Sequence, residues 1–290
     1  MTRKDLLREL LDAQAPESDR WRRKNQFYYE EVERIVRFHV PPGSSVLEIG
    51  CGTGDLLAAL APSRGVGLDI SLKTLEIARS KHHGLTFLAG DAEDLPLSEP
   101  FDYILLSDLI GYFNDVQRAF EQLNRVCSPR TRIILTYFNY LWEPVLRAGE
   151  RLGIKRPQPD QNWISLVDLQ NLLSLAGFQR ISMGYKVLLP VRAPLLSSLC
   201  NRVLANLPLL RKLCLVETII ARPAPVPVPE ETLSCSVVVP ARNERGNVEN
   251  AVRRIPPMGR HTEIVFVEGN SRDGTAEEIE RVSRRTRTGT

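Results

Sequence analysis

The chain has 290 residues, of which 43% are hydrophobic and 25% are charged. This is the composition of a folded globular protein, and it excludes both an intrinsically disordered chain and a fibrous one. The net charge of +3 is too small to predict a general affinity for nucleic acid.

The N-terminal stretch carries charges throughout and lacks the apolar core of a signal peptide, and no run of about 18 apolar residues could span a bilayer. The five cysteines show neither C-x-x-C pairs nor the spacing of metal ligands. We therefore expect a cytoplasmic protein with reduced thiols and no metal site.

A helical cap is expected over residues 1–40. Apolar residues recur at helical spacing between Phe27 and Phe38, and the pattern stops at Pro41-Pro42-Gly43. A short apolar strand at 45–49 runs into a glycine-rich turn at 50–54, and a helical pattern follows. Strand, loop and helix in this order form the unit from which nucleotide-binding α/β sheets are built.

The same alternation repeats along the chain. Further strands are predicted at 65–68, 86–89, 103–106, 132–137, 178–189 and 214–221. Helices are predicted at 72–80, at 116–126 and after Ser165, with Ser71, Asn114 and Ser165 as their N-caps. Strands that alternate with helices favour a doubly wound, parallel sheet within residues 41–223.

A leucine-rich segment, residues 191–213, lies between the last two predicted strands and contains Arg192, Arg202, Arg211 and Lys212. Leucine-rich helices usually belong to the core, so one interpretation is a helical insertion packed on the sheet. The other is a surface that contacts lipid, which would make the protein membrane-associated. A proline-rich spacer at 224–233 follows and predicts a domain boundary.

Two features predict a nucleoside site at the carboxyl ends of the strands. The glycine-rich turn lets a ligand approach the backbone, and Asp69 ends the next strand nineteen positions after Gly50. A ribose-binding acid typically stands about 20 residues after such a turn. A carboxylate can accept hydrogen bonds from two adjacent ribose hydroxyls, so the turn and the acid are expected to face one crevice.

The run Glu48-Ile49-Gly50-Cys51-Gly52-Thr53-Gly54 resembles the E-x-G-x-G-x-G signature of class I S-adenosylmethionine-dependent methyltransferases. The resemblance covers about residues 21–223 and implies an α/β fold, a Rossmann-like, doubly wound, mostly parallel sheet of seven strands. It also implies S-adenosylmethionine as the cofactor. By position in the family motifs, cofactor-binding roles fall on Glu48, Gly50, Cys51, Gly52, Gly54, Asp69, Ile70, Asp91, Ala92, Ser107 and Leu109.

Two further motifs refine these roles. The stretch from Gly90 to Pro96 resembles the family motif that reads adenine, which assigns Asp91 and Ala92 to the adenine ring. The stretch from Phe101 to Leu109 resembles the motif whose end faces the methionine moiety and the acceptor.

Methyl transfer from a sulfonium requires alignment of the acceptor and removal of its proton more than it requires a strong base. The candidate catalytic residues are Asp108, after the fourth strand, and Tyr28 and Tyr29 on the leading helix. Packing over the cofactor is the alternative role for the two tyrosines. The expected acceptor is a small molecule or a glycan-type or lipid-linked compound, and a non-catalytic module that binds S-adenosylmethionine is the alternative function.

Residues 234–290 restart as strand, loop, helix, strand, loop, helix and resemble the beginning of family 2 glycosyltransferases of the GT-A fold. The matching positions are Pro240, Asn243 and Glu244 in the first loop and Glu268, Ser271 and Asp273 in the second. Glu268-Gly269-Asn270 replaces the usual Asp-Asp-Gly, and Thr290 is reached before any D-x-D motif. We expect an incomplete βαβα segment that transfers no sugar alone. It is either part of a bifunctional glycosyltransferase or an unrelated regulatory appendage.

Overall fold

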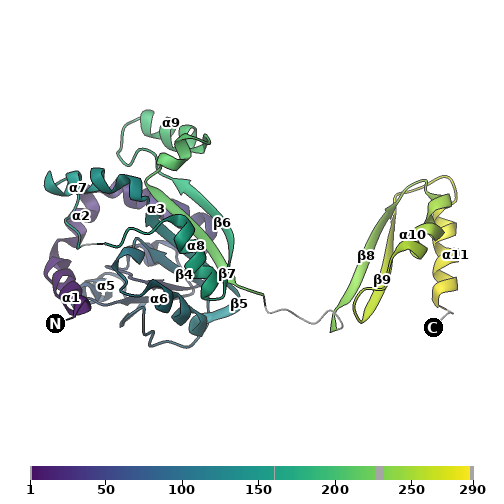
Figure 1. Ribbon diagram of the computed structural model, residues 1–290, viewed down its shortest axis with the longest axis horizontal. Helices are drawn as coiled ribbons and strands as arrows, with labels where there is room; N and C mark the ends of the chain where they lie inside the picture. Colours follow the sequence, from purple (N-terminus) through teal and green to yellow (C-terminus); the bar gives the residue numbers. More distant parts are fainter. Residues whose placement is uncertain (1, 160, 226–231, 288–290) are drawn as a thin grey trace. The chain divides into compact units, whose positions relative to one another are not determined.

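The computed structural model describes residues 2–159, 161–225 and 232–287, and the chain forms two compact units, Met1–Pro225 and Val226–Thr290 (Figure 1). The larger unit contains a seven-stranded sheet in the order β3-β2-β1-β4-β5-β7-β6. Its strands are β1 (Ser45–Ile49), β2 (Arg64–Asp69), β3 (Thr86–Ala89), β4 (Phe101–Ser107), β5 (Cys127–Phe138), β6 (Phe178–Lys186) and β7 (Val216–Pro223). Neighbouring strands pair in parallel except β7, which is antiparallel to β5 and β6. The predicted Rossmann-like, mostly parallel sheet is confirmed.

Helices cover both faces of this sheet and form the N-terminal segment. They are α1 (Arg3–Gln14), α2 (Ser18–Lys24), α3 (Gln26–His39), α4 (Asp55–Ala59), α5 (Leu72–Lys81), α6 (Val116–Leu123), α7 (Glu143–Arg151), α8 (Leu166–Leu175) and α9 (Leu196–Arg202). Ser71 and Ser165 cap α5 and α8 as predicted, each accepting a bond from a backbone N–H three residues on, at 3.1 and 3.2 Å. These helix starts follow from local sequence, because a cap satisfies an N–H that lacks an intrahelical partner.

Several predicted boundaries differ from the structure, and two of the differences have a local reason. Asp115 caps α6 in place of Asn114, because Asp115 stands directly before the first helical residue and accepts from the N–H of Arg118 at 2.9 Å. The strand predicted to reach residue 189 ends at Lys186. Val187 has a φ of 63°, which lies outside the extended region that strand pairing requires.

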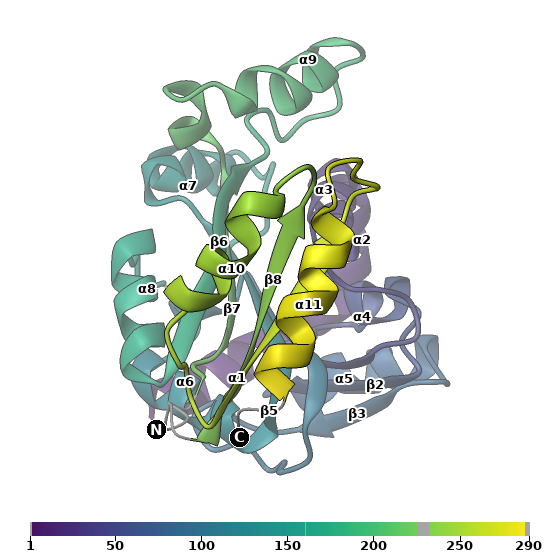
Figure 2. The same cartoon turned by 90° about the vertical axis from the view of Figure 1, so that its right-hand side faces the viewer.

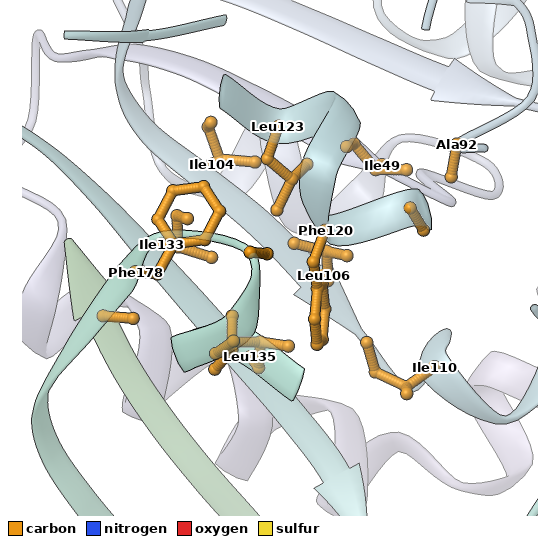
Figure 3. Packing of buried hydrophobic residues seen from close by; sticks show 14 of the residues in the cluster. Ile49, Ala92, Ile104, Leu106, Ile110, Phe120, Leu123, Ile133, Leu135 and Phe178 are labelled. Carbon is orange, nitrogen blue, oxygen red and sulfur yellow. The ribbon is translucent and has the colours of Figure 1, made fainter. Parts of the chain in front are cut away.

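Two hydrophobic clusters hold the helices against the sheet, one on each face. Alternate residues of a strand point to opposite faces, so Leu47 and Ile49 of β1 belong to one cluster and Val46 to the other. Figure 3 shows the first cluster, in which side chains from β4 and β5 pack against α6; these are Ile104, Leu106, Ile133, Leu135, Phe120 and Leu123. The buried faces fix the register of each strand.

The strand order of the sheet reverses direction at β1, which makes β1 and β4 a topological switch point. The chain passes from β1 outward through β2 to β3 and then returns to place β4 on the other side of β1, with Ile49 aligned to Leu106. In open α/β sheets, ligands bind beyond the carboxyl ends of the strands at such a switch point. The residues that follow Ile49 and Leu106 therefore meet where a ligand site is expected.

The leucine-rich segment 191–213 is not core. Within it only Ser197 and Ala205 are buried. The segment forms α9 and short 3-10 turns rather than one long helix, and it carries several exposed leucines. The interpretation of this segment as an insertion buried against the sheet is therefore wrong. Pro194 and Pro208 prevent a continuous helix from presenting one apolar face to the sheet.

The smaller unit is a βαβα segment, as predicted. Parallel strands β8 (Ser234–Ala241) and β9 (His261–Glu268) are covered on one face by α10 (Val248–Arg254) and α11 (Thr275–Arg287) (Figure 2). Val238, Val265 and Val267 are exposed on these strands. Two strands with an exposed apolar face fall short of an independent core. Of the spacer predicted at 224–233, residues 226–231 lie outside the described residues.

Candidate functional site

The glycine-rich turn after β1 and the acid that ends β2 converge. The N–H of Gly52 donates to Oδ2 of Asp69 at 2.9 Å, and the N–H of Ser71 donates to Oδ1 of the same carboxylate at 2.9 Å. Burial raises the pKa of Asp69, although these backbone hydrogen bonds lower it. Each carboxylate oxygen has a second lone pair, so the group can still accept hydrogen bonds from a ligand.

Two glycines of the turn, Gly50 and Gly52, have the positive φ that favours glycine. Gly50 has a φ of 71°, and a Cβ placed on it would lie 2.6 Å from Cδ1 of Leu109. Gly52 has a φ of 53°, and a Cβ there would meet nothing within 4 Å. The first glycine lets β1 and the segment after β4 pack closely, and the second leaves open space above the backbone. That open space is where a ligand can lie against the turn.

A cavity of about 690 Å³ opens beside this turn. Of the predicted site residues, it is lined by Tyr28, Tyr29, Glu48, Gly50, Cys51, Gly52, Asp69, Ser107 and Asp108. Its remaining wall is largely apolar and includes Trp21, Val32, Phe138, Trp142, Leu146 and Leu189. A cavity with mostly apolar walls and a few convergent polar groups is the usual form of a small-molecule site.

Asp108 is the most unusual group in this cavity. Its φ is 52°, which is rare for a residue other than glycine. Its Oδ2 accepts from the hydroxyl of Tyr28 at 2.5 Å, while its buried Oδ1 has no hydrogen-bond partner among the described residues. Burial raises the pKa of Asp108 to about 6, although the hydrogen bond from Tyr28, the positive charge of Lys155 and the nearby hydroxyl of Thr136 lower it. A strained, buried carboxyl with an unused acceptor atom is typical of a functional position.

The ring of Tyr28 is held between two aromatic neighbours. Its centroid lies 5.7 Å from that of Phe138 and 5.4 Å from that of Tyr29. Burial raises the pKa of the Tyr28 hydroxyl well above its ordinary value, and so does the nearby Asp108. The hydroxyl therefore stays protonated and donates to Asp108. Both alternatives for Tyr28, packing and chemistry, are compatible with this position.

Glu48 lies at the floor of the cavity. It is buried, its Oε2 accepts from the N–H of Leu57 at 3.1 Å, and burial raises its pKa to about 8. Arg22 of α2 lies nearby, with its guanidinium 4.8 Å from the centroid of the Tyr29 ring and its Nε 3.4 Å from Oδ2 of Asp55. Helix α2 therefore brings the positive charge of Arg22 into the cavity lining beside the glycine-rich turn.

Five predicted cofactor residues lie outside the cavity lining: Gly54, Ile70, Asp91, Ala92 and Leu109. Leu109 instead packs over Gly50, and Ala92 is buried. Asp91, which the resemblance assigns to adenine, forms an ion pair with Lys4 of α1. Lys4 also contacts Oε2 of Glu93 at 2.8 Å. The N-terminal helix thus covers the part of the sheet edge where adenine was expected.

Sequence reasoning missed the loop that roofs the cavity. Arg156 donates from Nε to Oε1 of Gln14 at 2.8 Å, and Gln14 donates from Nε2 to the carbonyl oxygen of Pro157 at 3.2 Å. Lys155 lies 2.5 Å from Oε1 of Glu150 and lines the cavity, and burial lowers its pKa. No motif marks this loop; the available signal was a pair of basic residues between apolar Ile154 and a proline.

In the part of the chain that the structure describes, no group of three or more histidine, cysteine, aspartate or glutamate side chains is arranged to hold a metal ion. The polar groups around the cavity are instead the carboxyls, tyrosines and cations described above. Their arrangement suits an organic ligand with a cationic or hydroxylated part beside an apolar body.

Comparison with known proteins agrees with this geometry. A family model described as a methyltransferase domain matches residues 19–183. An O-methyltransferase of Pyrenophora dematioidea is 29% identical over 171 residues, which cover 54% of this chain and 60% of that protein. A demethylmenaquinone methyltransferase of Bacillus cereus is 30% identical over 190 residues, which cover 55% of this chain and 79% of that protein. The chain thus spans less than two thirds of the first relative.

Solved structures show the same fold. A S-adenosylmethionine-dependent methyltransferase of Thermotoga maritima superposes with a TM-score of 0.55 at 21% identity, covering 75% of this chain and 99% of that one. Magnesium protoporphyrin IX methyltransferase of Synechocystis, solved with bound S-adenosylhomocysteine, superposes with a TM-score of 0.53 at 18% identity. The overlap covers 77% of this chain and 100% of that protein.

Proposed function

This chain belongs to the methyltransferase domain family that residues 19–183 match, and on that premise we propose that it methylates a small, largely apolar acceptor bound over Asp108. The methyl donor of the family is S-adenosylmethionine. When bound, it supplies a methyl group on a sulfonium, whose neutral thioether is a good leaving group. The single observation that carries the proposal is the unpartnered Oδ1 of Asp108 in an apolar-walled cavity beside the glycine-rich turn.

The residues present fit the donor. Asp69 has acceptor capacity for ribose hydroxyls, Gly52 leaves open space above the turn, and Arg22 brings a positive charge suited to a carboxylate. Glu48 and Ser107, two further residues predicted to bind the cofactor, line the same cavity. Asp91 and Ala92 fit less directly, because Lys4 forms an ion pair with Asp91. Adenine contact there would require Lys4 to release that carboxylate.

Asp108 is placed to receive a proton from the acceptor. Its Oδ1 is unpartnered while Tyr28 occupies Oδ2, and because Oδ1 is covered in this structure, an acceptor hydroxyl reaches it only after a neighbouring side chain moves. A carboxyl whose pKa is about 6 is ionised at neutral pH and is a stronger base than an ordinary aspartate. Tyr28 orients the carboxylate, and the roof loop with its apolar neighbours excludes water from the reacting atoms.

The acceptor proposal rests on the chemistry of the walls. Trp142, Leu146 and Leu189 offer apolar contact rather than the dense hydrogen bonding that a glycan needs. Two relatives are named as an O-methyltransferase and a demethylmenaquinone methyltransferase, and these names support a small-molecule acceptor. A glycan-type acceptor has no such support, and we propose a hydroxylated, mainly apolar molecule in its place.

The test is methyl transfer from isotopically labelled S-adenosylmethionine by the purified full chain, with phenols, quinols and sugars as separate acceptor panels. Label in the phenol or quinol panel, and its loss in Asp108→Asn, would support the proposal. Label confined to the sugars would overturn the acceptor class. Tight donor binding with no transfer to any panel would favour the non-catalytic binding module.

A second proposal concerns residues 234–290, as the beginning of a nucleotide-sugar-binding fold. In its support, the two loops that carry the resembling positions bond to each other: the N–H of Asn243 donates to the Ser271 hydroxyl at 2.9 Å. Glu268 does not fit the uridine contact, because its carboxylate accepts from the N–H groups of Asn270 and Ser271 at 2.9 and 2.5 Å. Titration of the full chain with uridine diphosphate tests the proposal, and absence of binding would favour the regulatory appendage.

A further inference from the structure

The mouth of the cavity is bordered by two segments with many exposed apolar side chains. One is the insertion 191–213, whose exposed residues include Leu195, Leu196, Leu199, Val203, Leu207 and Leu209. Leu195 is 89% exposed and Leu209 is 85% exposed. The other is α7 with the turn that follows it, where Val145, Leu152 and Ile154 are exposed. Large apolar side chains gathered on a surface indicate a contact site rather than ordinary scatter.

These two segments lie next to each other. Trp142, just before α7, donates from Nε1 to the carbonyl oxygen of Leu213 at 2.8 Å. Asn139 donates from Nδ2 to the carbonyl oxygen of Lys212 at 2.8 Å. In both Figures 1 and 2 the insertion that contains α9 stands beside α7. The two segments therefore form one rim, which we call the apolar rim.

The apolar rim is continuous with the inside of the cavity. Val145, Leu152, Ile154 and Val191 are exposed on the outside and also line the cavity. These four side chains give an apolar molecule continuous contact from the surface into the cavity, whose lining also includes the polar Lys155 and Arg156. A rim of this kind is expected where a ligand arrives from an apolar phase.

The charge of the insertion, one of the two segments of the apolar rim, indicates what the rim contacts. The insertion contains Arg192, Arg202, Arg211 and Lys212 and no acidic residue. Arg192 forms an ion pair with Glu30 of α3 at 2.5 Å, so Arg202, Arg211 and Lys212 are the cations that the insertion offers to a partner. It contains no aromatic residue, whereas the centres of protein interfaces are enriched in tryptophan and tyrosine. Aliphatic side chains interspersed with arginine and lysine suit an anionic lipid surface, where the chains enter the headgroup region and the cations meet phosphate.

We propose that the apolar rim docks on an anionic lipid surface and that the acceptor enters the cavity from that lipid phase. The entry route rests on the proposed methyl transfer, whereas the docking does not. The contact is peripheral: among the described residues no helix is long and apolar enough to cross a membrane. Docking covers the exposed leucines that water would otherwise surround.

The docking is tested by co-sedimentation of the full chain with vesicles of phosphatidylcholine, with and without phosphatidylserine, in the absence of a methyl donor. We expect binding to the vesicles that contain phosphatidylserine. Arg202→Gln with Arg211→Gln should lower the partition coefficient about 25-fold, since each charge contributes about fivefold. Leu195→Ser with Leu209→Ser should also lower it. The matched control is Leu175→Ser on α8, because Leu175 is 75% exposed but lies away from the rim.

Thermal unfolding of each variant shows whether it is folded, and the high exposure of Leu195 and Leu209 makes unfolding by substitution unexpected. The docking is overturned if the wild-type chain ignores both vesicle types, or if the rim variants bind as well as the control does. It is also overturned if the chain ignores vesicles and forms a dimer that the leucine variants dissociate.

A second arm separates docking from catalysis. Labelled methyl transfer to a lipophilic quinol embedded in the vesicles is compared with transfer to a water-soluble quinol. Loss of the first activity alone in the rim variants supports the entry route. Docking without methyl transfer to either quinol supports the lipid contact of the apolar rim and overturns the proposed function. Equal loss of both activities overturns the entry route.

Discussion

Replacing Asp108 with asparagine should remove the loss of stability that this carboxyl causes as pH rises, and it should also remove activity. Burial raises the pKa of this carboxyl from 3.8 to about 6. The folded state therefore holds the proton more tightly than the unfolded state does, and the free energy of unfolding falls as pH rises from the unfolded value through the folded one. The difference corresponds to about 3 kcal/mol when the carboxyl is fully ionised.

The pH dependence isolates this contribution from other effects of the substitution. Between about pH 4 and about pH 8, Asp108 should lower the wild-type free energy of unfolding by about 2 kcal/mol, and this part should vanish in Asp108→Asn. The new amide N–H at the position of the unpartnered Oδ1 lowers the stability of Asp108→Asn by an amount that does not depend on pH, so this cost cancels when the two pH values are compared. Other buried carboxyls, such as Glu48 and Glu217, contribute equally to both proteins.

Urea denaturation of both proteins at the two pH values gives the required difference of differences, with exposed Glu121→Gln as the control. Methyl transfer by Asp108→Asn should fall about 100-fold or more if the carboxylate takes the acceptor proton. An unchanged pH dependence of stability in Asp108→Asn would show that the carboxyl is solvated and that the argument from its burial is mistaken. Retained activity would remove it from the chemistry.

Three further predictions concern the same cavity. Asp69→Ala should keep the fold but weaken the binding of S-adenosylmethionine about 100-fold, since two hydrogen bonds to a charged acceptor are lost. Calorimetric titration measures this affinity, and an unchanged affinity would exclude Asp69 from the ribose contact. Gly50→Ala should destabilise the protein by about 1–3 kcal/mol, because its Cβ would lie 2.6 Å from Leu109 Cδ1; denaturation checks this, and Leu109→Ala should restore part of the loss. Tyr28→Phe removes a hydrogen bond that lowers the pKa of Asp108, so the acidic limb of the activity profile should move to higher pH; a profile that keeps its midpoint would show that Tyr28 only packs.

Local features of the chain could be predicted because they depend on neighbours in sequence. Ser71 and Ser165 cap helices through hydrogen bonds that span three residues, and a strand followed by a glycine-rich turn specifies the unit at Gly50. The convergence of that turn with Asp69 was also predictable, because successive strands of such a unit pair in parallel. The binding roles drawn from these positions stay predictions.

The sequence by itself determined that this protein is an α/β methyltransferase domain, and it predicted a nucleoside crevice at the carboxyl ends of the strands. Only the tertiary structure decided what surrounds that crevice. The roof depends on Arg156 meeting Gln14, which is far away in sequence, and the raised pKa of Asp108 depends on burial by several elements at once. The exposure of Leu195 and Leu209 likewise depends on which surfaces the remaining chain covers. Composition carries no record of such long-range contacts, because any apolar residue can lie in a core or on a rim.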